Sequence, residues 1–125
     1  MKTLVLAMLV LMAATASAEI SIVDNNKKLT VDCAKAKEVN LIGNNISVTL
    51  VGTCKLITVT GNSATVTGSG EKFYIAGNGN TVAAEVVDEI HITGNKNTVS
   101  WRKGTSKPSP KISNPGKDNK VTQLR

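Results

Sequence analysis

The sequence predicts an all-β protein, a short single-domain β-solenoid of about six coils with a repeat of 16–18 residues, after a cleaved signal peptide. Three observations predict this fold. The 125 residues, 41% hydrophobic and 19% charged, suffice for one small domain and are too apolar for a disordered chain. Only 2% are aromatic, so Val, Ile, Leu and Ala must build the core. A glycine-centred motif recurs along the chain, flanked by strand-like alternation of apolar residues.

Residues 1–18 have the three parts of a secretory signal peptide. Lys2 gives a positive start, residues 4–14 form an apolar run of 11 residues, and residues 16–18 (ASA) are a cleavage site. About 20 apolar residues are needed to cross a bilayer as a helix, so the run is too short for a membrane anchor. We expect cleavage between Ala18 and Glu19, and a periplasmic or secreted mature chain without a transmembrane anchor. An uncleaved anchor is the alternative.

Five glycines mark the repeat. The first four are followed directly by asparagine, as Gly43-Asn44, Gly61-Asn62, Gly77-Asn78 and Gly94-Asn95, and the fifth is Gly116. Five positions after the glycines stand Val48, Val66, Val82, Val99 and Val121. Four positions before them stand Val39, Ile57, Phe73, Ile90 and Ile112. We expect a looser first copy with Asn26 in the glycine position, so that successive anchors are 17, 18, 16, 17 and 22 residues apart.

Each unit has the chemistry of two strands joined by a turn. Residues 57–60 (ITVT) and 65–67 (TVT) alternate apolar and polar side chains, as in strands with one buried face. Glycine adopts a positive φ without steric cost and asparagine tolerates the left-handed region, so Gly-Asn is the expected structural turn. Units must stack to bury their apolar faces, at about 4.8 Å per coil. An antiparallel meander is the alternative, but recurrence of Asn and Thr at one phase favours stacked ladders.

Cys33 and Cys54 are the two cysteines, and we expect them to form a disulfide because exported proteins meet an oxidising compartment. Two free thiols are the alternative. The two cysteines do not hold equivalent positions in their repeats, so a bond between them requires a local adjustment of the backbone.

The chain resembles a family, the bacterial domain of unknown function 3060. The resemblance is carried by the two cysteines, by residues 97–101 (NTVSW) and by residues 114–119 (NPGKDN), and it covers nearly the whole mature chain. It implies export, and it brings no established reaction or catalytic residue.

The repeats are expected to occupy residues 19–101, and residues 102–125 form a basic segment containing Pro and Lys, with a final repeat-like coil. This segment has seven Lys and Arg against Asp118, whereas residues 19–101 have seven Lys against eight Asp and Glu. Six of its residues are candidate contacts to an anion or a partner: Arg102, Lys103, Lys107, Lys111, Lys117 and Lys120. An envelope protein or an anionic glycan would suit them. Specific nucleic-acid binding is not expected because no aromatic residues alternate with the lysines. A solvated terminus is the alternative.

Two single residues allow a functional reading beside a structural one. His91 is expected to point outward, where Glu85, Asp88 and Glu89 would complete a divalent-metal site or an acid–base pair; an ordinary surface histidine is the alternative. Trp101 is expected to point inward as a plug that closes the last coil, with a sugar-stacking platform as the alternative.

Outward hydroxyls flank the inward valines of successive units. They are Ser47 and Thr49, Thr65 and Thr67, Thr81, and Thr98 and Ser100, with Ala83 interrupting the array. Such rows are typical of ice-binding solenoids, and β-propensity alone also places Thr on solvated strands. The interruption favours the second interpretation.

One His and two Cys leave little material for a metal site or a His-activated nucleophile, so we assign no catalytic residue, metal or cofactor. We expect a non-enzymatic exported solenoid that acts as a rigid structural or binding module in the periplasm or envelope. One alternative is a small periplasmic inhibitor or immunity protein that blocks an envelope-directed enzyme. Another is a subunit that assembles through its open strand edges.

Overall fold

The computed structural model describes residues 19–104 and 108–124, which form ten strands and no helix. The strands are β1 (Glu19–Val23), β2 (Lys28–Asp32), β3 (Glu38–Asn44), β4 (Ser47–Asn62), β5 (Thr65–Asn78), β6 (Thr81–Val86), β7 (Glu89–Ile92), β8 (Thr98–Lys103), β9 (Lys111–Ser113) and β10 (Lys120–Gln123). The expected signal peptide and Lys107 lie outside the described residues.

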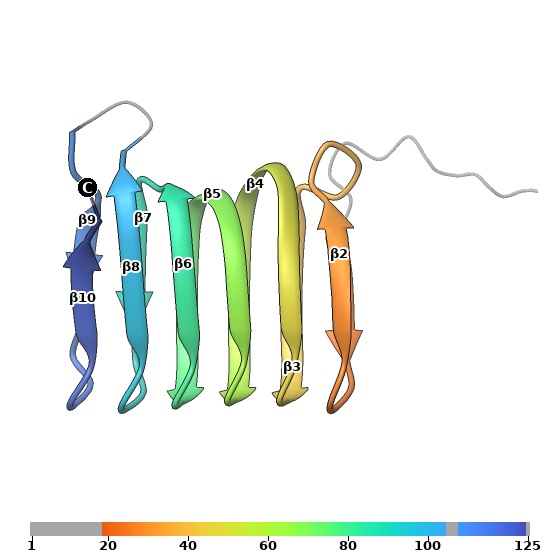
Figure 1. Cartoon of the computed structure of the whole chain (residues 1–125), viewed down its shortest axis with the longest axis horizontal. Coiled ribbons are helices and arrows are strands. Elements are labelled where there is room, and N and C mark those ends of the chain that lie inside the picture. The colour runs from red at the N-terminus through yellow and green to blue at the C-terminus, as the bar shows by residue number, and fades with distance from the viewer. Residues whose placement is uncertain (1–18, 105–107, 125) are drawn as a thin grey trace, which may run out of the picture.

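The strands stack as a β-solenoid of about six coils, side by side from β2 at one end to β10 at the other (Figure 1). Every pairing between the described strands is parallel, which confirms the solenoid and excludes the meander. One side of each coil is formed by β1, β3, residues 56–62 of β4, residues 72–78 of β5, β7 and β9. The opposite side is formed by β2, residues 47–51 of β4, residues 65–68 of β5, β6, β8 and β10.

The core consists of inward rows in which equivalent residues of successive coils lie directly beside one another. The three longest rows are Val39, Ile57, Phe73 and Ile90; Leu41, Val59, Ile75 and Ile92; and Val48, Val66, Val82 and Val99. All twelve are buried, which confirms the predicted strand phase. At about 1.5–3 kcal/mol per buried large apolar side chain, these rows are the main stabilising contribution.

The expected register of the first coil is wrong by two residues. β1 pairs with β3 so that Val23 lies opposite Ile42, and Asp24 therefore takes the position of Gly43, in place of Asn26. The N–H of Asn25 donates to the Asp24 carboxylate, and this bond and Lys27 hold the pKa of Asp24 below its usual range. The sequence signal was the pair Asn25-Asn26, which matches Asn44-Asn45 of the next coil.

The turns differ in one respect from the expectation. Gly43, Gly61 and Gly77 do adopt positive φ, but the asparagines directly after them do not. The left-handed position is the next residue along, and it is occupied in different coils by Asn26, Asn45, Ser63, Gly79, Lys96 and Asp118. The asparagine is needed for another reason, its side-chain hydrogen bond to the neighbouring coil.

Two asparagine ladders run along the turns. In the outer ladder, the amide oxygen of each asparagine accepts the backbone N–H of its counterpart in the next coil; its members are Asn25, Asn44, Asn62, Asn78 and Asn95, and the last accepts from Lys117. The inner ladder of Asn80, Asn97 and Asn119 was not predicted. Asn80 and Asn97 are buried, and the equivalent positions of earlier coils hold Ile46 and Ala64. The outer ladder could be read from the repeat, whereas the inner one starts only at the fourth coil.

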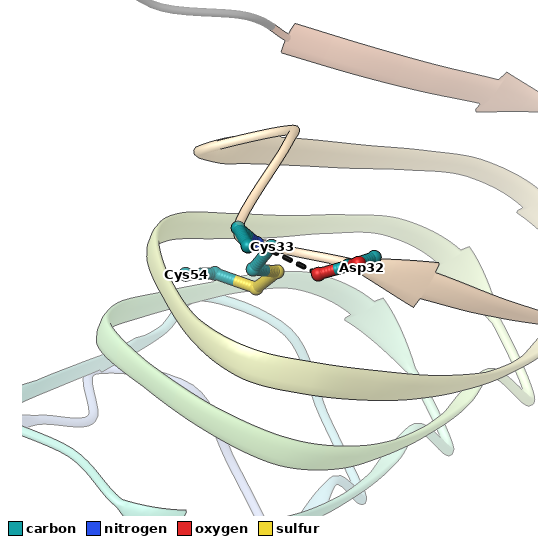
Figure 2. The surroundings of a disulfide bond; sticks show 4 residues. Asp32, Cys33 and Cys54 are labelled. Carbon is teal, nitrogen blue, oxygen red and sulfur yellow. Dashed lines mark hydrogen bonds between the residues drawn. A yellow bond between two sulfur atoms is a disulfide. The ribbon is translucent and has the colours of Figure 1, made fainter.

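Cys33 and Cys54 form the predicted disulfide, with a Cα–Cα distance of 5.0 Å and both residues buried. Between the pairs Asp32–Val51 and Glu38–Leu56, the first coil has residues 33–37 and the second has only residues 52–55, so the expected local adjustment of the backbone lies at the corner that holds the two cysteines. Figure 2 shows the bond beside Asp32, whose carboxylate accepts the N–H of Ala34 at 2.9 Å. The disulfide therefore fastens the corner after β2 to the next coil.

Trp101 points inward and is 6% exposed, but it does not close the stack. β10 pairs with β8 and places Gln123 beside Trp101, so one further coil lies beyond Trp101. The inward position of Trp101 is therefore confirmed, and its interpretation as a sugar-stacking platform is wrong. The final coil expected for the C-terminal segment follows it as β9 and β10. The open end lies one coil later, where Ile112 is 42% exposed because no coil follows it.

Candidate binding surfaces

The two flat outer sides of the solenoid carry most of its regular surface chemistry. We call the outer side of β2, β6, β8 and β10 and the adjoining parts of β4 and β5 the threonine face. Its two outward rows are Lys28, Ser47, Thr65, Thr81, Thr98 and Lys120, and Thr30, Thr49, Thr67, Ala83, Ser100 and Thr122. The predicted hydroxyl rows are thus in register, with Ala83 inside them and a lysine at each end of one row.

We call the opposite outer side, along β1, β3, β7, β9 and the remaining parts of β4 and β5, the tyrosine face. One outward row is Ser21, Asn40, Thr58, Tyr74, His91 and Ser113. The row beside it is Val23, Ile42, Thr60 and Ala76, with Thr93 following β7 at the next position. These two rows, the neutral strip of the tyrosine face, contain no Lys, Arg, Asp or Glu.

Tyr74 and His91 form the one aromatic contact among the described residues. Their ring centroids are 5.5 Å apart with an interplanar angle of 43°. Tyr74 is 38% exposed, so its ring is open to solvent on one side. The neighbouring row adds Ile42, 38% exposed, and Val23, 69% exposed. Sequence reasoning missed Tyr74, although its position between inward Phe73 and Ile75 already marks it as outward.

The acidic residues expected around His91 do not all meet it. Glu85 lies in β6 on the threonine face, where its carboxylate accepts the Arg102 Nε–H at 2.9 Å. Glu89 shares β7 with His91 and lies beside Lys72 and Lys111 of the adjoining coils. Asp88 precedes β7, and its backbone is held by Glu71 and Lys111. In the part of the chain that the structure describes, no group of three His, Cys, Asp or Glu residues could hold a metal ion.

The predicted basic residues are spread around the last two coils rather than gathered on one face. Arg102 and Lys103 end β8, Lys111 lies in β9 beside Glu89, Lys117 lies at the turn, and Lys120 lies in β10 beside Thr98. A hollow of about 540 Å³ lies at one corner, lined by Glu85, Arg102, Lys103, Gln123 and Leu124. Arg102 there is paired with Glu85, so the hollow combines both signs of charge.

The two ends of the solenoid do not continue one another's rows. If a second copy placed its first coil in register on the last coil, Lys28 would meet Lys120, because these residues end one row of the threonine face. Lys117, in the outer-ladder position, would offer no amide oxygen to the next Asn25. Glu19 would meet Lys111 favourably, as one exposed pair.

Among residues 19–104 and 108–124, no helix is long and apolar enough to cross a membrane. Residues 62–118 match the model of a family described as "Protein of unknown function (DUF3060)". The matched segment runs from the outer-ladder Asn62 to the turn of the last coil and contains Tyr74 and His91. No curated protein and no solved structure matches the chain.

Proposed function

We propose that the chain is a member of the family of proteins of unknown function (DUF3060) whose model matches residues 62–118. We further propose that it is an exported, non-enzymatic binding module whose rigid solenoid presents a flat outer face to a component of the cell envelope. One observation carries this proposal. The outward side chains of both faces stand in straight, in-register rows, and those of the neutral strip and of the hydroxyl rows make no hydrogen bond to the described part of the chain.

Rigidity supports a role in recognition. Inward apolar rows and the two asparagine ladders fix each coil against the next, so the outward groups are held at regular intervals before any ligand arrives. A preorganised surface loses little conformational entropy on binding, and entropy loss is a main cost of association.

Export is supported by the signal-like residues 1–18 and by the Cys33–Cys54 disulfide. Disulfides of this structural kind persist in oxidising compartments and are rare in the cytosol of most cells. A role other than catalysis is supported by the environment of His91, because one of its three candidate acidic partners, Glu85, is bonded to Arg102 on the opposite face. The ring of His91 instead contacts Tyr74.

The test begins with the full chain, including its own leader, expressed in a bacterial host and followed by fractionation and mass measurement. We expect a product that begins at Glu19, lies outside the cytoplasm and has no free thiol. Retention in the cytoplasm with two free thiols would overturn the proposal of export.

The second step immobilises the oxidised mature protein and measures which components of a native envelope extract it retains. Two matched variants each place a charge at the centre of one face: Thr58→Lys on the tyrosine face and Thr67→Lys on the threonine face. We expect stoichiometric retention of one component, lost with one of these variants and kept with the other. Retention of nothing, or retention that neither variant changes, would contradict binding through a flat face.

A further inference from the structure

The tyrosine face has an exposed aromatic ring, that of Tyr74, which the threonine face lacks. We propose that its neutral strip binds an extended, uncharged, β-linked polysaccharide chain, with Tyr74 as the stacking platform and the polar residues of the strip as hydrogen-bonding partners. This inference rests on the proposed function and names the class of ligand for one face.

The shape of the strip favours a linear polymer over a globular protein. Strand geometry sets its two rows about 7 Å apart, and six coils give it a length of about 24 Å. Even with the width of its side chains included, this is roughly a few hundred Å², whereas a stable protein interface needs about 800 Å² from each partner. A single extended chain covers such a strip completely.

The spacing along the strip matches a chain of sugars. Neighbouring coils are about 4.8 Å apart, which is close to the length of one pyranose unit in an extended β-linked chain. Successive sugars lying along the solenoid axis therefore meet successive coils, and each coil offers a polar side chain. In one row these groups are Ser21, Asn40, Thr58, the hydroxyl of Tyr74, His91 and Ser113, and in the other row they are Thr60 and Thr93.

Tyr74 supplies the apolar contact that a pyranose ring requires. The C–H groups on one side of such a ring are apolar, and an exposed aromatic ring covers them while its hydroxyl remains free to hydrogen-bond. Tyr74 lies near the middle of the strip, is 38% exposed, and is supported from one side by His91. Ile42 is a second exposed apolar side chain in the neighbouring row, two coils away from Tyr74.

The charges beside the strip favour an uncharged ligand. The adjacent outward row contains Glu19, Glu38, Leu56, Lys72, Glu89 and Lys111, so opposite charges partly cancel along it. A polyanion would gain little there, because Lys72 and Lys111 both lie beside Glu89. The basic residues of the C-terminal segment lie mostly outside this row.

The threonine face has the same spacing and width but no aromatic ring, and it therefore serves as an internal control. The experiment uses the oxidised mature protein and measures its depletion from solution by insoluble cellulose, insoluble chitin and, as the polyanionic probe, calcium alginate gel. We compare the wild type with Tyr74→Ala, with Tyr74→Phe, which keeps the ring, and with Thr67→Ala on the threonine face.

We expect retention on cellulose or chitin, at least a tenfold loss of affinity for Tyr74→Ala, and less than a threefold change for Tyr74→Phe and Thr67→Ala. Circular dichroism and a urea titration show that each variant is folded and as stable as the wild type, and Tyr74→Phe separates the role of the ring from that of its hydroxyl. Wild-type binding to neither uncharged polymer, binding to alginate alone, or equal binding by Tyr74→Ala would overturn the inference. If the chain still retains an envelope component that is lost with Thr67→Lys, the inference fails while the proposed function stands.

Discussion

The amide oxygen of Asn97 accepts the backbone N–H of Asn80 at 2.9 Å, and both residues are buried. The Asn97 amide nitrogen donates to the Gly77 carbonyl oxygen at 3.1 Å and to Asn119 Oδ1 at 3.0 Å. One buried side chain therefore satisfies two backbone groups of the preceding coil and also bonds the side chain of Asn119 in the following coil.

Asn97→Ala should be among the most destabilising polar substitutions in the protein. It leaves the buried Asn80 N–H without an acceptor, and a buried unsatisfied group costs about 1–3 kcal/mol in addition to the lost bonds. We expect a decrease of about 2–4 kcal/mol in the free energy of unfolding, measured by urea titration. Asn78→Ala in the exposed outer ladder is the matched control, with a decrease of about 1 kcal/mol or less, because water replaces its bonds. Equal decreases would contradict the role assigned to the inner ladder.

Val66 and Thr65 are neighbours in β5 that point to opposite sides of the strand, the first buried and the second exposed. Val66→Asp would bury a carboxylate among apolar rows. The free-energy cost of burying an unpaired charge exceeds the total free energy of unfolding of most small domains. We expect this variant to lack the β-sheet circular dichroism spectrum of the wild type. Thr65→Asp should keep that spectrum and change the free energy of unfolding by about 0.5 kcal/mol. Similar behaviour of the two variants would show that the strand phase is wrong.

Gly77 and Gly79 separate two reasons for glycine in one turn. At Gly77, a Cβ atom would collide with the backbone carbonyl oxygen of Gly61 in the adjacent coil, whereas at Gly79 it would meet open space. Gly79→Ala should therefore cost only the strain of a left-handed residue, about 1–2 kcal/mol. Gly77→Ala must move two coils apart, and we expect it to cost more than twice as much in a thermal or urea titration. A smaller effect at Gly77 than at Gly79 would contradict close packing between the turns.

These residues also show how far the sequence could predict the structure. Strand phase and coil number could be predicted from Val66 and its equivalents, because the alternation of apolar and polar residues and the spacing of the repeat can be read from the sequence alone. The inner ladder of Asn80 and Asn97 could not be predicted, since the equivalent positions of the earlier coils hold Lys27, Ile46 and Ala64 and the asparagine side chains are bonded only between stacked coils. Tyr74 was predictable as an outward residue, but its contact with His91 depends on the register between β5 and β7. The shift at the first coil arose because Asp24 replaces glycine where no preceding coil approaches it.

Reduction of the Cys33–Cys54 disulfide should destabilise the protein by about 3 kcal/mol, because the bond closes a loop with a sequence separation of 21 residues. The effect should be strongest in the first two coils, which lie on either side of the bond. We expect faster amide hydrogen exchange in β1 and β2 after reduction, with exchange in β6 and β8 nearly unchanged. The double variant Cys33→Ser/Cys54→Ser should behave as the reduced protein does. Unchanged exchange in β1 and β2 would show that the bond does not fasten this end.

The mismatch between the two ends predicts a monomer. Both ends expose unpaired strand edges and apolar side chains, which by themselves favour end-to-end addition. In register, however, such addition would place Lys28 beside Lys120 and would interrupt the outer ladder at Lys117. The one favourable contact, between Glu19 and Lys111, is an exposed ion pair and contributes little. We expect a single monomeric species by sedimentation velocity up to about 100 µM at low salt, where like-charge repulsion is least screened. Lys117→Asn/Lys120→Glu should restore the ladder and reverse the repulsion, giving measurable association. Wild-type fibres at this concentration, or no difference between the two proteins at higher concentrations, would show that these lysines do not cap the solenoid.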